Sequence, residues 1–355
     1  IDTSKEDYDE SELSFEFKEN PLVSQKNYRS IKESFLALEK KHGDRSESLL
    51  SIERENYSLI CQSYGSLARK MVAIEDVSLS SNLYFNNKGS YSSAYGKYLT
   101  GIVADLASYS IGCMVGRYSL DNPGLVLASQ GETVRDYFAQ IPEPTFAPDK
   151  SAIIPLTDQE WFPDDATNRF RDFVCTVWGE EHLQENLDFV AESLCLYAIK
   201  PKKGEAALET IRRYLSTQFF KDHLRTYKKR PIYWLFSSGK QKAFECLVYL
   251  HRYNESTLAE MRTDYVIPLT TKLASYVEKL EQDKDASTSA AEAKAIEKEL
   301  GKLYKQQAEL NTFDEKLRHY ADQRITLDLD DGVKVNYGKF GDLLAEVKVV
   351  VGKDA

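Results

Sequence analysis

LTTKLASYVEKL (residues 269–280) and IEKELGKLYKQQAELNTFDEKLRHY (296–320) are the most regular stretches of this sequence. Their apolar residues recur every three or four positions, with one interval of seven: Leu269, Leu273, Tyr276, Leu280, Ile296, Leu300, Leu303, Leu310, Phe313, Leu317 and Tyr320. This spacing places the apolar side chains on one face of a helix, and it leaves Lys302 and Glu309 on exposed faces. The small residues Ala286–Ala291 separate the two stretches, which therefore predict a long antiparallel coiled-coil hairpin.

The segments around this hairpin mix helical and extended patterns. Downstream, Ile325–Leu329 and Val333–Val335 flank Asp330-Asp331-Gly332, which predicts a β-hairpin followed by a terminal strand or helix. Upstream, PIYWLF (231–236) and Ile153–Pro155 predict short buried strands or extended segments. Apolar spacing predicts further helices, and we list them by number: 164–178, 181–198, 205–227 and 241–252. The pair Thr157 and Glu160 has the spacing of a capping box that starts a helix.

The N-terminal part is less regular. Apolar spacing at 28–38 and 49–64, interrupted by Gly43-Asp44, predicts an antiparallel helix pair. Residues 78–98 are rich in Ser, Asn, Gly and Tyr and predict a long polar surface loop, with a turn at 86–89. Residues 99–120 predict a buried helix that ends near Gly116, and Leu125–Leu127 a further short strand or linker.

These patterns predict an α+β fold that is predominantly α-helical, with a helical spacer region, a mixed α/β core and the coiled-coil hairpin. We expect four segments: a mobile acidic segment at 1–20, a helical spacer with the polar loop at 21–150, a mixed α/β basic region at 151–258, and the hairpin with its C-terminal elements at 259–355. Residues 1–20 hold eight acidic residues and two lysines, with too little apolar content to order themselves.

Composition limits the class of protein. No apolar window is long enough to span a bilayer, and the acidic start IDTSKEDYDESE is neither a signal peptide nor a transit peptide. The absence of an initiator Met is consistent with a fragment or a processed chain. The five cysteines are scattered and form no C-x-x-C pair, which favours buried thiols in a reducing cytoplasm over a metal site. The five histidines do not cluster either.

The net charge of −10 is unevenly distributed. Residues 200–242 contain twelve Lys or Arg against three acidic residues. Local fields act within a Debye length of about 8–10 Å, so this region can attract phosphates despite the acidic whole. We take the exposed cations and hydroxyls here as candidate DNA contacts: Arg225, Lys228, Lys229, Arg230, Ser237, Ser238, Lys240, Lys242 and Arg252. Either Arg252 or the loop at 78–98 is hypothesised to read bases. The alternative is a solvated charged surface, and the aromatic residues 233–236 are interpreted as core.

Motifs of catalysis are missing. The sequence has neither G-x-G-x-x-G after a strand, nor G-x-x-x-x-G-K-[ST], nor G-x-S-x-G. Asp121-Asn122-Pro123-Gly124 lacks the second proline and the aromatic of the Asn/Asp-Pro-Pro-Tyr/Phe loop of adenine methyltransferases, so it is interpreted as a turn. Glu346-x-Lys348 with Asp330 or Asp331 could suggest a nuclease metal site, but surface charge is the favoured interpretation. We therefore predict no catalytic residues, no metal and no cofactor in this chain.

A family resemblance adds to these patterns. The segment YKKRPIYWLFSSGKQKAFECLVYLHRYNEST (227–257) resembles the most distinctive stretch of the PglX family of BREX phage-defence methyltransferases. Four more blocks resemble the family in the same order, at residues 108–126, 153–174, 178–190 and 327–340, and SFEFKENPL (14–22) is a weaker match. Together they cover about two thirds of the chain.

The resemblance implies an S-adenosylmethionine-dependent enzyme that methylates the N6 of adenine in double-stranded DNA. It places the catalytic domain, which holds the cofactor, N-terminal to this sequence, and leaves a target-recognition role for this C-terminal region. Whether this chain is an enzyme by itself stays undecided. The implied partners are duplex DNA, the methyltransferase domain and other BREX components, in the cytoplasm and without a membrane. The alternative is a non-catalytic docking module for those components, with DNA read elsewhere.

Overall fold

The computed structural model describes residues 2–25, 28–64, 72–85 and 90–352. The chain divides into two compact units, each built from separated segments. The first unit contains Ile1–Ser110, Asn122–Leu125 and Phe170–Tyr214, and the second contains Ile111–Asp121, Val126–Arg169 and Leu215–Ala355. Neither unit coincides with one of the four segments expected from the sequence. Helices dominate, as predicted, and one small sheet supplies the β component.

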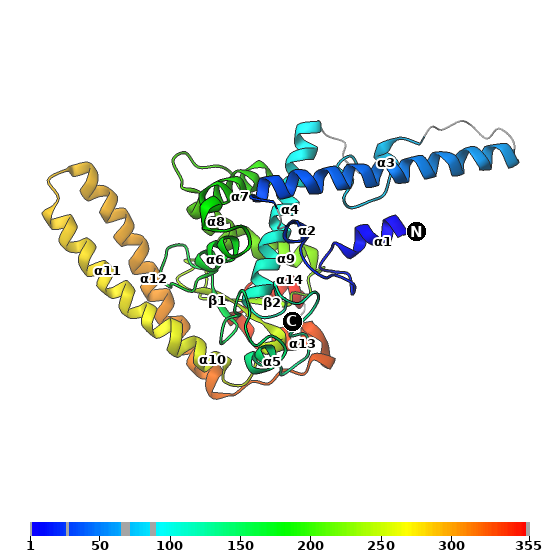
Figure 1. Ribbon diagram of the computed structural model, residues 1–355. Helices are drawn as coiled ribbons and strands as arrows, with labels where there is room; N and C mark the ends of the chain where they lie inside the picture. Colours follow the sequence, from blue (N-terminus) through cyan, green and yellow to red (C-terminus); the bar gives the residue numbers. More distant parts are fainter. Residues whose placement is uncertain (1, 26–27, 65–71, 86–89, 353–355) are drawn as a thin grey trace. The chain divides into compact units, whose positions relative to one another are not determined.

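The described part of the first unit is helical (Figure 1). Its elements are α1 (Asp2–Asp9), α2 (Pro21–Ser24), α3 (Ile31–Tyr64), most of α4 (Tyr91–Met114) and of α6 (Ala166–Trp178), α7 (Leu183–Tyr197), α8 (Ala207–Tyr214) and 3-10 turns at Ile74–Asp76 and Glu180–His182. The predicted helices at 164–178 and 181–198 are confirmed as α6 and α7.

Helix α3 corrects the predicted helix pair. It runs through Gly43 as one helix of 34 residues. Leu38, His42 and Arg45 are all buried, and their spacing of four and three keeps one buried face on both sides of the glycine. A single glycine inside a helix costs only about 1 kcal/mol relative to alanine, so packing of this face outweighs the expected break.

Two further expectations for the first unit change. The predicted loop at 78–98 ends early, because α4 begins at Tyr91 and buries Ala94 and Leu99; the turn expected at 86–89 lies outside the described residues. The predicted end of this helix near Gly116 is confirmed: α4 ends at Met114, and Gly116 has a φ of +77°.

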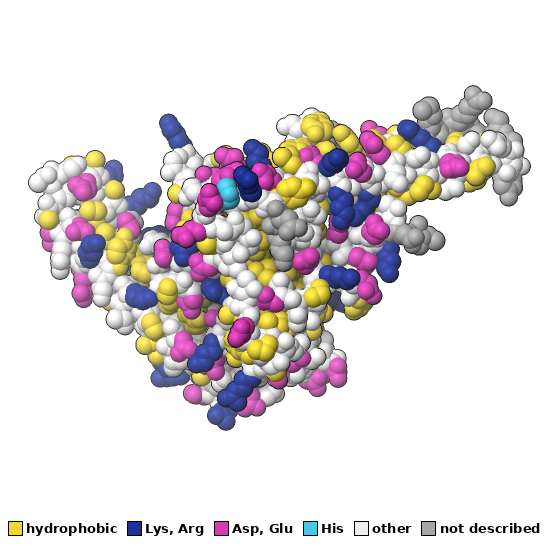
Figure 2. All heavy atoms as spheres, viewed as in Figure 1, with side chains coloured by type: hydrophobic (Ala, Val, Ile, Leu, Met, Phe, Trp, Pro, Cys, Tyr) yellow, Lys and Arg dark blue, Asp and Glu magenta, His cyan; other side chains and the backbone are white. Residues whose placement is uncertain are grey.

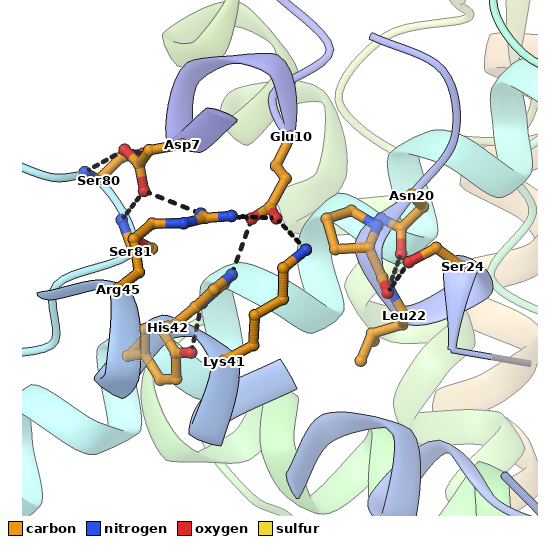
Figure 3. Close-up of polar contacts among 12 residues, drawn as sticks. Asp7, Glu10, Asn20, Leu22, Ser24, Lys41, His42, Arg45, Ser80 and Ser81 are labelled. Atoms are coloured by element: carbon orange, nitrogen blue, oxygen red, sulfur yellow. Dashed lines mark hydrogen bonds and ion pairs between the residues drawn. The ribbon is translucent and has the colours of Figure 1, made fainter. Parts of the chain in front are cut away.

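Residues 1–20, for which mobility stays a prediction, contain helix α1 and take part in an ion-pair network with α3 (Figure 3). The Asp7 carboxylate accepts hydrogen bonds of 2.7 Å from both the backbone N–H and the hydroxyl of Ser80. The Glu10 carboxylate lies 2.8 Å from Arg45 Nη2 and 2.8 Å from His42 Nε2. Charge pairing therefore connects this segment, which has few apolar residues, to α3.

The second unit contains an antiparallel sheet of β1 (Ile153–Pro155), β2 (Tyr233–Ser237) and β3 (Glu245–Tyr249), in the order β1-β3-β2. The predicted strands β1 and β2 are confirmed, whereas no strand forms at Leu125–Leu127. Strand β3 corrects the helix predicted at 241–252. Every residue of β3 is buried, and its short apolar run Cys246–Tyr249 suits a central strand as well as a helix.

Helices surround this sheet in the second unit. They are α5 (Val134–Gln140), α9 (Phe220–Thr226), α10 (Thr257–Glu260), α11 (Ile267–Ala286), α12 (Ala290–Asp322), α13 (Gly332–Gly338), α14 (Val347–Val350), π-helical turns at Leu215–Phe219 and Met261–Val266, and 3-10 turns at Leu250–Arg252, Leu329–Asp331 and Gly341–Leu343. The helix predicted at 205–227 is confirmed as α8, a π-helical turn and α9. The capping box predicted at Thr157 is wrong, because α6 starts only at Ala166, where Asp165 accepts a 2.8 Å bond from the N–H of Asn168.

The prediction of a C-terminal β-hairpin is also wrong. The 3-10 turn at Leu329–Asp331 runs into α13. The side chain of Asp328 accepts a hydrogen bond from the N–H of Asp330, and buried Asn336 donates to the carbonyl oxygen of Gly332. These side-chain bonds satisfy the backbone locally and take the place of a strand ladder.

The predicted helical hairpin is α11 and α12, joined by residues 287–289 (Figure 1, yellow to orange). Its apolar seam is buried at Leu269, Leu273, Val277, Leu280, Leu300, Leu303, Leu310, Phe313 and Leu317. Val277 takes the place predicted for Tyr276, whose hydroxyl instead donates to Glu299 at 2.8 Å. The two paired helices are as predicted, and supercoiling of the coiled-coil type stays a prediction.

Candidate nucleic-acid interface

The turn Tyr227–Arg230, which we call the basic turn, follows α9 in the second unit. Its backbone forms a Schellman motif: the N–H of Lys229 bonds to the carbonyl of Leu224 at 2.7 Å, and the N–H of Lys228 to that of Arg225 at 3.2 Å. Lys228 occupies the position of such motifs that usually holds glycine, and it has a φ of +50°. Lys229 follows with a φ of +63°.

Helix α4 provides an internal comparison. It ends in the same motif, in which the N–H of Arg117 bonds to the carbonyl of Gly112 at 2.8 Å, and Gly116 takes the left-handed position. A side chain in this conformation costs about 1 kcal/mol, because its Cβ approaches the following carbonyl. The chain therefore keeps a lysine at a position where glycine would be less strained, and such strain gathers at functional sites.

The charges of the basic turn are accessible. Lys228, Lys229 and Arg230 are exposed, and no carboxylate of the described residues forms an ion pair with any of them. Arg225, at the end of α9, is also exposed but lies 2.7 Å from the carboxylate of Asp222. The turn thus presents three uncompensated cations and one that is partly neutralised.

The loop between β2 and β3, residues 238–243, is the second basic feature. Lys240 is exposed at its tip, without an ion pair among the described residues. Lys242 is engaged: its Nζ donates to the carbonyl of Ser216 at 2.7 Å and to the carboxylate of Glu245 at 2.8 Å. Glu245 is buried, and burial raises its pKa although Lys242 acts to lower it. We infer that Lys242 serves the structure and Lys240 is the free cation.

The three remaining candidates make internal contacts. The hydroxyl of Ser237 donates to Glu245 at 2.9 Å, and that of Ser238 donates to Glu309 at 2.7 Å. Arg252 is buried, and its guanidinium donates to the backbone carbonyls of Val115, Asp149 and Lys150 at 2.7–3.1 Å. Both terminal nitrogens of this buried guanidinium are therefore engaged by backbone carbonyls, so the structure offers no support for base reading by Arg252.

The structure does not bring all candidates into one patch. The basic turn precedes β2 and the loop 238–243 follows it, and a five-residue strand spans about 16 Å at ~3.3 Å per residue. On the face drawn in Figure 2, basic and acidic side chains are interspersed. The geometry therefore suits separate phosphate contacts better than one continuous basic surface.

The aromatic residues beside these cations form the core, which confirms their interpretation from the sequence. Tyr233, Trp234 and Phe236 are at most 1% exposed. His223 on α9 ties the helix to β2, since its Nε2 accepts the backbone N–H groups of Ile232 at 3.1 Å and Tyr233 at 3.2 Å. Burial, with the nearby charge of Arg117, lowers the pKa of His223 to about 3. It is thus a neutral packing residue and not a phosphate ligand.

Among the described residues, no group of three or more His, Cys, Asp or Glu side chains could hold a metal ion, and no helix has the length and apolarity to cross a membrane. The Asp121 carboxylate, in the string nearest to a methyltransferase loop, accepts a 2.9 Å bond from the N–H of Thr145. This carboxylate holds a bend of the chain, so the string does not fit the loop that grips adenine.

Known proteins resemble this chain along nearly its whole length, although no family profile matches it. It is 50% identical over 355 residues to the adenine-specific methyltransferase BrxX of Escherichia coli O9:H4 (strain HS), covering 99% of this chain and 29% of that protein. It is 36% identical over 349 residues to the adenine-specific methyltransferase PglX of Lacticaseibacillus casei (strain Zhang), covering 96% of this chain and 27% of that protein.

Both relatives are adenine-specific methyltransferases. The chain belongs to the PglX family of these proteins, as its sequence blocks predicted. It spans less than a third of the length of either relative.

Proposed function

We propose that this chain is a DNA-binding, target-recognition portion of an N6-adenine methyltransferase of BREX phage defence. The observation that carries the proposal is the basic turn, where Lys228 and Lys229 are exposed, lack a carboxylate partner among the described residues and adopt left-handed backbone conformations. Cations of this kind bind duplex DNA by releasing the counterions of phosphates.

Two contact points follow from the fold. The basic turn supplies Lys228, Lys229 and Arg230, with Arg225 beside them, and the loop 238–243 supplies Lys240. Their separation across β2, of the order of 16 Å, exceeds the ~12 Å width of the major groove. Such contacts fix the register of a duplex without reading its sequence.

The methyl transfer belongs to another part of the protein. We assign the S-adenosylmethionine site and the loop that grips adenine to a domain outside this sequence, since neither the cofactor-binding motif nor the motif of that loop occurs here. Enzymes that modify a base inside a duplex flip it out of the stack. This chain would hold the flanking DNA while the target adenine enters that domain, in the cytoplasm and together with other BREX components.

Salt-dependent binding tests the proposal. In the full-length methyltransferase, Lys229→Ala and Lys240→Ala should each weaken binding to target and non-target DNA by similar factors. Each should also reduce the slope of log affinity against log salt by about one unit. Lys305→Ala, on the exposed side of α12, is the matched control and should change neither. Mobility shifts across a salt series measure both quantities.

Unchanged affinity and slope in both variants would remove these cations from the interface. That result would support the alternative function, in which this chain docks other BREX components. One observation favours that alternative independently: Tyr304 on α12 is 47% exposed while its hydroxyl donates to Glu281 on α11, and exposed tyrosines are common anchors in protein interfaces.

A further inference from the structure

The first unit contains a cavity of about 230 Å³ between α3, the segment that follows Ile74 and the start of α4. Helix α3 contributes Glu39 and Glu47 to its lining, and the other two elements contribute Tyr84, Tyr91 and Tyr98. His42 and Ser81, labelled in Figure 3, also line it. Carboxylates and phenol rings thus face one space.

Two of the tyrosines leave ring surface open. Tyr84 is 39% exposed and Tyr91 is 59% exposed, with ring centroids 6.2 Å apart. Tyr91 also stacks on Tyr95 at 6.0 Å with an interplanar angle of 23°. This pairing holds the Tyr91 ring in place at the rim without covering it. Large aromatic side chains that remain exposed around a recess are typical of binding surfaces.

Glu39 is one of two carboxylates in the lining that lack an ion pair within the described residues. It is half-buried, and no described residue forms an ion pair or hydrogen bond with its carboxylate. Burial raises its pKa above the ordinary range. Glu47 is exposed and likewise has no ion pair within the described residues. A partly buried carboxylate without a partner is costly unless a cation approaches it.

The basic side chains near the cavity make other contacts. His42 bridges Tyr98, at 2.7 Å from Nδ1, and Glu10, at 2.8 Å from Nε2. Arg45, on the same helix, bonds to Glu10 at 2.8 Å (Figure 3). No Lys or Arg lines the cavity in the part of the chain that the structure describes. Apart from His42, the ionisable side chains of the lining are therefore carboxylates and phenols.

We propose that this cavity binds an organic cation, a guanidinium or a primary ammonium on a short aliphatic chain. The carboxylate of Glu39 would accept its N–H donors, and the faces of Tyr84 and Tyr91 would attract its charge. An anion would meet two carboxylates, and a neutral apolar molecule would leave Glu39 uncompensated. The cation can come from a free small molecule or from an arginine or lysine side chain of another polypeptide.

Calorimetric titration of the full-length protein tests this site with a matched pair of probes, n-butylguanidinium and n-butylurea, which share a shape but differ in charge. We expect n-butylguanidinium to bind at least tenfold more tightly. Glu39→Gln and Tyr91→Leu should each weaken it at least fivefold. Glu55→Gln, further along α3 and outside the cavity, should leave it unchanged. Tyr91 is exposed, so its replacement keeps the test valid if Glu39→Gln unfolds.

A third probe distinguishes the two sources of the cation. Tighter binding of the peptide acetyl-Gly-Arg-Gly-amide than of n-butylguanidinium supports a polypeptide side chain, and the reverse order supports a free small molecule. Equal binding of the guanidinium and urea probes would overturn the proposal, as would an affinity that neither variant changes. The outcome is independent of DNA binding, because the site shares no residue with the basic turn.

Discussion

The carboxylate of Glu309, on α12, accepts a hydrogen bond of 2.7 Å from the hydroxyl of Ser238, on the loop that follows β2. It also accepts the backbone N–H groups of Gln241 at 2.8 Å and Ala243 at 3.3 Å. Gly239 belongs to the same contact, since a Cβ at this position would lie 3.0 Å from a Glu309 oxygen. One side chain of the helical hairpin thus fixes the loop that presents Lys240.

Glu309→Ala should lower the free energy of unfolding by about 1–3 kcal/mol, because three donors lose a charged acceptor. Glu315→Ala, at an exposed position of the same helix, is the control for helix propensity. Urea unfolding of the two variants measures the difference. Equal stabilities would show that water replaces Glu309 at no cost. The apolar spacing places Glu309 on an exposed face of the helix, but its carboxylate makes these three contacts there.

Lys228→Gly and Lys228→Ala separate charge from backbone strain. Both remove the cation, but only glycine relieves the left-handed conformation, so Lys228→Gly should be more stable than Lys228→Ala by about 1 kcal/mol. DNA affinity should fall equally in both. Thermal unfolding and salt-dependent DNA binding give the two readouts. A DNA affinity that follows stability instead of charge would contradict the assignment of Lys228 to phosphate contact.

Arg252→Lys should destabilise the second unit by about 2 kcal/mol or more, since a lysine cannot reach all three carbonyls that the guanidinium satisfies. Discrimination between target and non-target DNA should remain intact in the folded protein. Chemical unfolding tests the first statement, and competition binding with mismatched sites tests the second. Relaxed specificity with unchanged stability would restore Arg252 as a reader of bases.

Leu310→Asp should destabilise the helical hairpin by more than about 3 kcal/mol, because it buries a charge at a position that is 0% exposed. Lys305→Asp should be nearly silent, since Lys305 is exposed without an ion pair among the described residues. Lys302 is a poorer control than the sequence suggested, because it lies 2.5 Å from Asp158. Similar unfolding free energies for the Leu310 and Lys305 variants would contradict the assignment of Leu310 to a buried apolar seam between α11 and α12.

Glu10→Gln should make the protein less sensitive to acid. Burial alone would raise the pKa of Glu10, but hydrogen bonds from His42 and Arg45 outweigh burial and lower it below the ordinary 4.5. A lowered folded pKa gives stability that is complete above about pH 4.5 and is lost as the pH falls toward the folded value. At pH 7, the free energy of unfolding of Glu10→Gln should be lower than that of the wild type by on the order of 2 kcal/mol. Below pH 4.5, its free energy of unfolding should change less with pH. The control variant Glu16→Gln should follow the wild type.

The sequence predicts elements whose pattern is local. The hairpin helices follow from heptad-like spacing over more than forty residues, and β2 follows from six apolar residues between a basic run and Ser-Ser-Gly. Strand β3 could not be separated from a helix, because the short apolar run Cys246–Leu250 would be buried equally well by helical or extended packing. The C-terminal helix α13 was missed because Asp-Asp-Gly is a turn signal that here starts a helix.

The candidate site shows the same limit. Accessible lysines at 228, 229 and 240 were predictable from a local excess of charge. The hydrogen bonds of Arg252 were not predictable, since its partner Val115 lies 137 positions away in sequence. The Glu309 contact is also long-range, with 71 positions to Ser238. The spacing within α12 marks which face is apolar, but it carries no signal for a polar contact to a distant loop.

The strand order β1-β3-β2 has a consequence for how the second unit assembles. Strands β2 and β3 pair across a short loop, with Phe236 opposite Cys246, whereas β1 reaches β3 only by bringing Ile153 to Val248. Closing the longer loop costs more chain entropy and delays the contacts that repay it. The β2–β3 pair, with both lysine-bearing turns at its ends, is therefore able to form early during synthesis, and β1 docks as the late step that completes the sheet.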